Sequence, residues 1–266
     1  MLAPDTWIDL ARYPLPDFAA DRTRRVVAEA ERELARSGMA VLPGFLKEEA
    51  LSALAAECDA LAPLGHFSEV RGTPYIDLPD LAQPEGHPRR TFGRSALSAV
   101  AYDRFPATSA LRALYEWDPL LEFVRVLLGR ERLFRYADPL GALNLAVMRA
   151  GDELAWHFDQ TDFVVSLAIQ SSEAGGEFEC VPLIRSESDE RHDAVSAVLS
   201  GETKPIIVPM TPGTLMLFEG RRSIHRVSPI QGERPRYVAL LAYDTKPGTD
   251  SSELLKRVRY GRLPGA

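Results

Sequence analysis

The sequence is poor in cysteine, in histidine and in long apolar segments. Its two cysteines, Cys58 and Cys180, form no CxxC pair and no zinc spacing, and they exclude a disulfide framework, so we expect a reducing, cytoplasmic location. No run of about 18 apolar residues occurs, and residues 1–10 lack a positively charged start before an apolar stretch. We therefore expect no membrane span and no secretory signal.

Positive charge is also in deficit. The 31 Lys and Arg residues stand against 38 Asp and Glu residues, which gives a formal net charge of −7. Domains that bind nucleic acid usually carry a basic surplus, so we expect no nucleic-acid partner. A hydrophobic share of 45% and a charged share of 26% are ordinary for a folded protein and exclude wholesale disorder. The composition leaves the oligomeric state open.

The first half of the chain has the pattern of helices and one long loop. Apolar side chains recur at helical spacing in four segments. The predicted helices are 21–37, 47–61, 108–115 and 118–128, and a short strand is predicted at 39–42. Prolines and glycines interrupt 63–95 so often that we expect a long covering loop there.

The second half has the pattern of short strands. Runs rich in β-branched and aromatic residues, bounded by Gly, Pro or Asp, predict these strands. They are 143–148, 163–170, 176–183, 205–210, 214–218 and 236–243, with a polar insert at 184–204 that contains a helix at 189–199. Helices followed by antiparallel strands favour an α+β fold with a jelly-roll core. We expect one domain over 1–266, with a helical and lid region (1–132), a β core (133–245) and a C-terminal tail (246–266).

A histidine and an aspartate lie two residues apart in WHFDQTDF, just before a predicted strand. On an extended segment His157 and Asp159 point to the same side, and His225 follows a later strand. Two imidazoles and one carboxylate that leave open positions suit non-haem Fe(II). An HxD pair is common by chance, and Asp159 also fits a turn residue or a helix N-cap.

An arginine adds to this pattern. Arg236 opens the predicted strand RYVALLAY, eleven residues after His225. A guanidinium donates two parallel hydrogen bonds to a carboxylate, so the metal residues and the arginine together indicate a site for a dicarboxylate. Arg234 is the alternative, but the apolar run begins directly after Arg236 and favours that residue.

Three further residues are candidates for substrate contacts. Arg94, near the end of the predicted loop, suits a substrate carboxylate, and it also fits a solvated arginine. Trp156 and Asp162 flank the HxD pair and fit either the walls of a substrate site or core and capping positions. The remaining histidines are interpreted as surface residues: His66, His87 and His192.

The order of these motifs resembles the Fe(II)- and 2-oxoglutarate-dependent oxygenases. The resemblance rests on HFD (157–159), GGEFE (175–179), GTLMLF (213–218), GRRSIHRV (220–227) and GERPRYVALLAYD, and on RSGMAVLPGFLKEEALSAL near the N-terminus. Within this superfamily, the polar insert and the segment after it look most like the bacterial free amino-acid hydroxylases and halogenases.

The resemblance implies a double-stranded β-helix in which His157, Asp159 and His225 bind Fe(II) and Arg236 binds the distal carboxylate of 2-oxoglutarate. It also implies O2 as co-substrate, release of succinate and CO2, and a small-molecule substrate such as a free amino acid. Halogenases of this type lack the carboxylate ligand, because a halide takes its position. Asp159 is present, so we expect hydroxylation of an unactivated C–H, or desaturation, and not halogenation.

Two other functions are weighed. The same chemistry on a protein or nucleic acid is the first, but the negative net charge and the lid-like loop disfavour it. A cupin-like metal protein without oxygenase activity is the second, and Arg236 disfavours it because such a barrel needs no dicarboxylate anchor. A basic amino acid is one candidate substrate, since Asp162 is able to pair with an amine.

Overall fold

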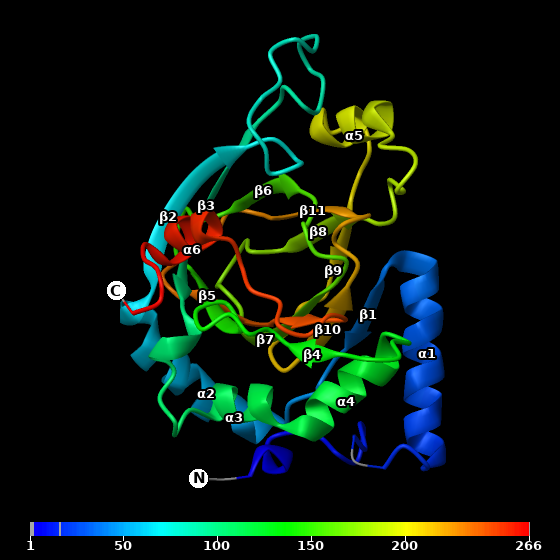
Figure 1. The fold of residues 1–266 in the computed structure, drawn as a ribbon, viewed down its shortest axis with the longest axis vertical. Helices are drawn as coiled ribbons and strands as arrows, with labels where there is room; N and C mark the ends of the chain where they lie inside the picture. Colours follow the sequence, from blue (N-terminus) through cyan, green and yellow to red (C-terminus); the bar gives the residue numbers. More distant parts are fainter. Residues whose placement is uncertain (1–2, 16, 266) are drawn as a thin grey trace.

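Two facing antiparallel sheets form the centre of the computed structural model, which describes residues 3–15 and 17–265 (Figure 1). The larger sheet has the order β1-β10-β7-β12-β5-β3-β2 and the smaller one β6-β11-β8-β9. The larger sheet comprises β1 (Met39–Leu42), β2 (His66–Gly72), β3 (Gly93–Val100), β5 (Leu143–Met148), β7 (Val164–Gln170), β10 (Leu215–Phe218) and β12 (Arg236–Leu241). The smaller sheet comprises β6 (Leu154–His157), β8 (Phe178–Val181), β9 (Ile206–Val208) and β11 (Ile224–Val227), and β4 (Phe134–Arg135) pairs separately with β13 (Tyr243–Asp244).

Four helices cover the outer face of the larger sheet: α1 (Asp21–Ser37), α2 (Glu48–Leu61), α3 (Ala110–Glu116) and α4 (Asp118–Leu127) (Figure 1). The helix α5 (His192–Leu199) lies near the smaller sheet, and α6 (Glu253–Tyr260) packs beside β2 and β3. Short 3-10 turns lie at Pro4–Thr6, Ala62–Leu64 and Tyr102–Arg104. Leu54 and Phe123 from the helices pack in one apolar cluster with Leu145 and Leu167 from the strands. Because side chains alternate along a strand, the intervening residues of the same strands face the smaller sheet and line an interior cavity.

The predicted α+β class and jelly-roll core are confirmed by this arrangement. The predicted helix at 21–37 and strand at 39–42 have the bounds of α1 and β1. The other predicted helices and core strands agree within a few residues. The end of α1 follows a local signal, because Gly38 adopts φ 65 directly beyond the helix. The assignment of all residues to a single domain stays a prediction.

The predicted loop at 63–95 is partly wrong. Residues 66–72 and 93–100 pair as β2 and β3, and only 73–92 form an irregular loop, which we call the lid. Strands are predicted from the alternation of apolar and polar residues. The sequence of β2 does not alternate in this way, because β2 is an edge strand that is largely exposed and pairs with β3 alone.

The predicted tail at 246–266 also contains structure. It forms α6, where the Ser252 hydroxyl accepts a hydrogen bond from the Leu255 amide and Gly261 ends the helix with φ 70. Both signals are visible in the sequence. The buried Lys256 side chain of α6 forms ion pairs with two residues outside the helix. Its Nζ lies 3.7 Å from Asp138 Oδ1 and 2.5 Å from Asp250 Oδ1.

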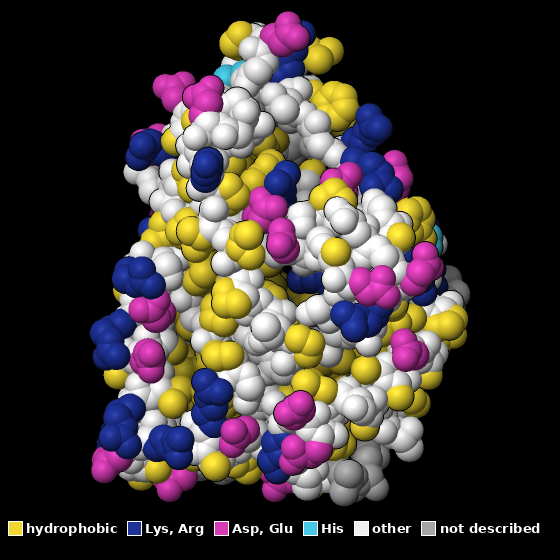
Figure 2. Space-filling view, turned by 180° about the vertical axis from the view of Figure 1, so that it is seen from behind, with side chains coloured by type: hydrophobic (Ala, Val, Ile, Leu, Met, Phe, Trp, Pro, Cys, Tyr) yellow, Lys and Arg dark blue, Asp and Glu magenta, His cyan; other side chains and the backbone are white. Residues whose placement is uncertain are grey.

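Charged side chains of both signs are interspersed over the face shown in Figure 2. No helix of the described residues is long and apolar enough to cross a membrane. Cys58 and Cys180 are buried and unpaired, so both pack in the interior as small apolar side chains.

Candidate metal and co-substrate site

The three predicted metal ligands lie together between the two sheets. His157 ends β6, His225 lies on β11, and the two residues are direct partners in the register of these strands. Asp159 follows two residues after His157, with Oδ1 3.8 Å from His157 Nε2 and Oδ2 3.6 Å from His225 Nε2. One donor atom from each residue lies within 4.8 Å of the others, so a single ion has room to contact all three.

Backbone carbonyl groups orient both imidazoles. His157 Nδ1 lies 2.8 Å from the carbonyl oxygen of Ala155, and His225 Nδ1 lies 3.0 Å from that of Ser223. A carbonyl only accepts hydrogen bonds, so Nδ1 carries the proton in each ring. The Nε2 lone pairs are therefore free and point toward Asp159, as metal ligation requires.

Apolar walls keep His225 neutral. The rings of Phe178 and Phe218 lie 5.3 and 4.7 Å from its ring centroid, and the residue is buried. Burial, and then the neighbouring His157, lower the pKa of His225 to about 4. A neutral imidazole at physiological pH is the form that binds a metal ion.

Gly220 leaves the space that the Asp159 carboxylate occupies. A Cβ at position 220 would lie 1.7 Å from Asp159 Oδ2 and 2.5 Å from its Cγ. The Gly220 carbonyl also accepts a hydrogen bond from the Asp159 amide at 3.1 Å. Sequence reasoning missed this residue, although it opens the GRRSIHRV motif that contains His225.

Arg236 and Ser166 line the same cavity as the triad, in a space of about 150 Å³. Arg236 is 8% exposed, and its hydrogen-bond contact is the Met148 sulfur at 3.9 Å. Burial lowers its pKa to about 10, and no carboxylate of residues 3–15 and 17–265 offsets this effect. The buried Ser166 hydroxyl also has no partner among the described residues. A buried guanidinium and a free hydroxyl beside a triad of metal-binding type fit a carboxylate co-substrate.

Arg234, the alternative anchor, is occupied elsewhere. Its guanidinium donates to the carbonyl oxygens of Ser171 and Ser172 at 2.9 and 3.1 Å. It lines none of the surface of the triad cavity. The geometry therefore favours Arg236 over Arg234.

The candidate substrate residues differ from one another in their surroundings. Arg94 lies 3.1 Å from Glu69 and 3.4 Å from Glu153, so two carboxylates already neutralise its charge. Asp162 is an exposed residue that pairs with Arg221 at 2.7 Å. Neither residue lines the cavity of the triad. Trp156 does adjoin the site, because it lines a groove that also reaches His157.

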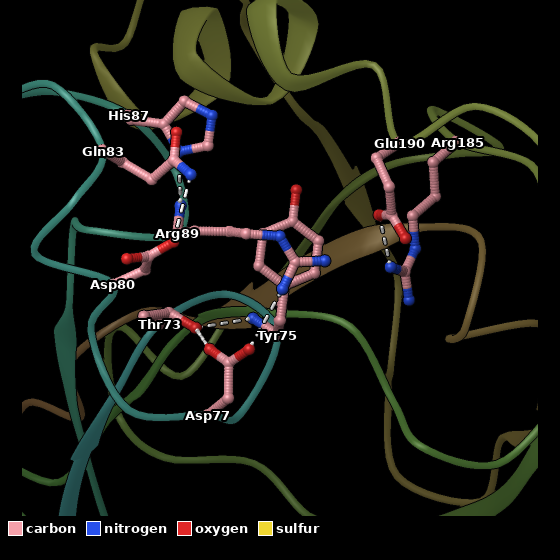
Figure 3. A network of polar contacts seen from close by, with 9 residues as sticks. All are labelled: Thr73, Tyr75, Asp77, Asp80, Gln83, His87, Arg89, Arg185 and Glu190. Atoms are coloured by element: carbon pink, nitrogen blue, oxygen red, sulfur yellow. Dashed lines mark hydrogen bonds and ion pairs between the residues drawn. The ribbon is translucent and has the colours of Figure 1, made fainter.

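The lid contacts the polar insert, and Figure 3 shows Tyr75 and Arg89 of the lid together with Arg185 and Glu190 of the insert. The Arg89 guanidinium lies 4.4 Å from the Tyr75 ring centroid, and Arg185 of the insert lies 5.4 Å from the same ring. Arg185 also lies 3.9 Å from the Phe158 ring and 2.7 Å from Glu190. Phe158 stands between the two ligands of the HxD motif, so the lid is coupled to the metal site.

Two histidines predicted to be surface residues also belong to this contact. The rings of His87 on the lid and His192 on α5 lie 4.6 Å apart, and both residues are half-buried. Burial, and then His87, lower the pKa of His192. The interpretation as free surface residues is wrong for this pair, because the lid and insert cover both, whereas His66 is exposed.

Comparison with known proteins identifies the fold. A 2OG-Fe(II) oxygenase-family oxidoreductase from Burkholderia pseudomallei is 16% identical, with a TM-score of 0.52 over 84% of this chain and 92% of that one. The α-ketoglutarate-dependent epimerase SnoN from nogalamycin biosynthesis, solved with Fe3+ and α-ketoglutarate, is 17% identical, with a TM-score of 0.58 over 91% and 92%. A prolyl-4-hydroxylase from Pseudomonas putida is 18% identical, with a TM-score of 0.50 over 81% and 97%.

The sequence matches none of the curated proteins. It does match the family model described as halogenase D over residues 22–256, which is most of the chain. The fold predicted from the resemblance is confirmed, since one similar structure is a 2OG-Fe(II) oxygenase-family member and another was solved with Fe3+ and α-ketoglutarate. The chain therefore belongs to the halogenase D family, and its fold is that of the Fe(II)- and 2-oxoglutarate-dependent oxygenases.

Proposed function

We propose that this protein is an Fe(II)- and 2-oxoglutarate-dependent oxygenase that hydroxylates an unactivated C–H of a small molecule, namely a free amino acid. The observation that carries the proposal is the cavity in which the triad of His157, Asp159 and His225 adjoins Arg236. A structural role for Arg236 is disfavoured, because a buried guanidinium without a carboxylate destabilises the free protein. We also propose a cytoplasmic location, since both cysteines are unpaired.

The residues of the chain have separate roles in this proposal. His157, Asp159 and His225 would hold Fe(II) and leave positions open on one side. Arg236 and the Ser166 hydroxyl would bind the distal carboxylate of 2-oxoglutarate and fix its orientation. When bound, iron and 2-oxoglutarate supply the oxidant that removes hydrogen from the substrate. The phenylalanines around His225 exclude water from that space.

Asp159 decides between hydroxylation and halogenation. The name of the family points to halogenases, in which a halide needs the coordination position that a carboxylate otherwise takes. Asp159 is directed at both histidines, and Gly220 leaves room for it. We therefore propose that oxygen, and not halide, is transferred to the substrate. Desaturation begins with the same removal of hydrogen and is the nearest alternative.

Protein substrates are the second candidate, since one similar structure is a prolyl-4-hydroxylase. The contacts between the lid and the insert favour a small molecule, because they close one side of the site against a long chain. A cupin-like protein without oxygenase activity is disfavoured by the burial of Arg236.

The test measures succinate formed from 2-oxoglutarate by the Fe(II)-loaded protein in chloride buffer, first alone and then with each free amino acid. We expect slow succinate formation alone, faster formation with a substrate, and a product heavier by one oxygen atom. Chlorine in the product would contradict the role of Asp159. The absence of succinate under all conditions would contradict the proposed function.

A further inference from the structure

A second hollow opens beside the metal site and has a different chemical character. This groove, of about 220 Å³, lies between β2, β6 and α6. It shares Leu97, Leu154, His157 and Arg259 with the wall of the triad cavity, so the two spaces meet at a metal ligand. We call it the substrate groove, because the inner cavity already contains the residues assigned to iron and 2-oxoglutarate.

Large apolar side chains line most of the substrate groove and remain exposed. Val70, Ile76, Leu255 and Val258 are between 39% and 49% exposed, although they come from three separate segments of the chain. Trp156 also lines the groove. An apolar surface assembled around an opening to a reaction site suits the apolar body of a ligand.

Arg259 is the charged residue of this groove. It lies on α6, and its Nη2 lies 3.3 Å from Asn144 Oδ1, a neutral partner. Within the described residues, the salt bridges of α6 belong to Lys256, so no carboxylate neutralises Arg259. Arg94, in contrast, is paired with two carboxylates outside this groove. Arg259 is therefore a cation that faces both spaces and is available to an anionic ligand.

No acidic side chain lines the substrate groove among the described residues. The carboxylate of the inner cavity is Asp159, which is assigned to the metal. Asp162, which sequence reasoning offered as a partner for an amine, is occupied by Arg221. A ligand with a cationic side chain would therefore lose hydration in this groove and gain no ion pair.

We propose that the substrate is a carboxylic acid with an apolar body, whose carboxylate pairs with Arg259 while its body lies in the substrate groove. This inference rests on the proposed oxygenase function and narrows its substrate class. Among free amino acids it selects those with apolar side chains and excludes basic ones. Arg259 is then a specificity-determining residue, and Arg236 retains the co-substrate.

The first test is calorimetric binding to the Fe(II)- and 2-oxoglutarate-loaded protein without oxygen, so that no turnover occurs. The probes are apolar L-amino acids from alanine to tryptophan, their C-terminal amides, L-lysine, and 4-methylpentanoate as the leucine analogue without an amine. We expect at least one apolar acid to bind, and its amide and L-lysine to bind at least about tenfold more weakly. Comparison of leucine with 4-methylpentanoate shows whether the α-amine is also recognised.

Two pairs of variants assign the binding to this groove. Arg259→Gln should weaken binding at least about tenfold, whereas Arg257→Gln, an exposed position on the same helix, should leave it unchanged. Arg259→Lys keeps the charge and should retain part of the affinity. Val258→Asp should weaken binding of the apolar body, whereas Leu254→Asp, 72% exposed and outside the groove, should not.

Four results would overturn the inference: no binding by any apolar acid, equal binding of acid and amide, binding of L-lysine in preference, or unchanged binding by Arg259→Gln. A rise in the Kd for 2-oxoglutarate in Arg259→Gln would also overturn it, because Arg259 would then anchor the co-substrate. Succinate formation in the absence of any substrate tests the oxygenase function separately, so the two hypotheses can fail independently.

Discussion

His157 and His225 face each other across paired strands, whereas the walls of the substrate groove come from a hairpin, a four-residue strand and a C-terminal helix. The candidate metal ligands are positioned by a paired scaffold: β11 has backbone hydrogen bonds to β6 on one side and β8 on the other, and β6 is paired with β11. The lid and α6 are held mainly by side chains, such as Arg185 on Phe158 and Lys256 on Asp138. Under the proposed function, the reaction chemistry would lie on the paired strands and the substrate choice on elements whose sequence changes at lower cost to stability.

The largest effect is expected from Gly220→Ala, which tests the packing around the candidate metal ligands. The added methyl group would occupy the position of the Asp159 carboxylate, so we expect Fe(II)-dependent succinate formation to fall by about 100-fold. Circular dichroism should show a retained fold. The matched control is the Asp159→Ala background, in which the glycine change should add little, since the collision partner is gone. An additive loss in the double variant would contradict this account.

A second test separates the roles of Arg234 and Arg236 in binding 2-oxoglutarate. Arg236→Gln should raise the Kd for 2-oxoglutarate by roughly 10- to 100-fold, because it removes a buried charged hydrogen-bond donor. Arg234→Gln should have little effect, since that side chain binds backbone carbonyls at the surface. Calorimetry of the Fe(II)-loaded protein measures both.

The same Arg236 variant should weaken co-substrate binding but stabilise the cofactor-free protein. In the cofactor-free protein its guanidinium is a buried charge without a carboxylate, so Arg236→Gln should increase the free energy of unfolding. Urea denaturation measures this change. A decrease in stability would indicate that Arg236 supports the fold and not the co-substrate.

Substitutions at the contacts of the lid should have smaller effects, and these effects should appear in the dynamics of the lid and not in metal binding. Arg185→Met removes the cation from the Tyr75 and Phe158 rings and from Glu190, which corresponds to about 1–2 kcal/mol of lid docking. We expect faster amide hydrogen exchange over residues 73–92 and little change in Fe(II) affinity. Arg191→Met, at an exposed neighbouring position, is the control. Unchanged exchange in Arg185→Met would show that other contacts hold the lid.

The smallest expected effect is the pH dependence of the metal-free protein. The pKa of His225 is about 4 in the folded state, below its ordinary value of 6.5, so the unfolded state binds the proton first. The stability that neutral His225 contributes is complete above pH 6.5 and declines as the pH falls toward 4. Thermal unfolding across this range should therefore show a shallower decline in His225→Gln. An equal decline in both proteins would contradict the burial of a neutral imidazole.

Sequence reasoning identified the elements that carry strong local signals. The periodicity of α1, its terminal Gly38 and the β-branched runs of the core strands were sufficient for the jelly-roll prediction. It did not identify β6 or β11, although equally short strands such as β1 and β10 were predicted, because LAWH and IHRV include polar side chains and do not form continuous apolar runs. It also missed α6, although Ser252 and Gly261 mark both ends.

The sequence by itself determined which residues are candidates to bind iron and a dicarboxylate, since imidazole, carboxylate and guanidinium chemistry is local to the side chain. Tertiary structure decided which of these groups are free. It placed Arg94 and Asp162 in ion pairs, left Arg236 buried without a carboxylate among the described residues, and brought Arg259 from the tail to the wall of the triad cavity. The physical reason is that the availability of a charge depends on its spatial neighbours, and those come from distant segments of the chain.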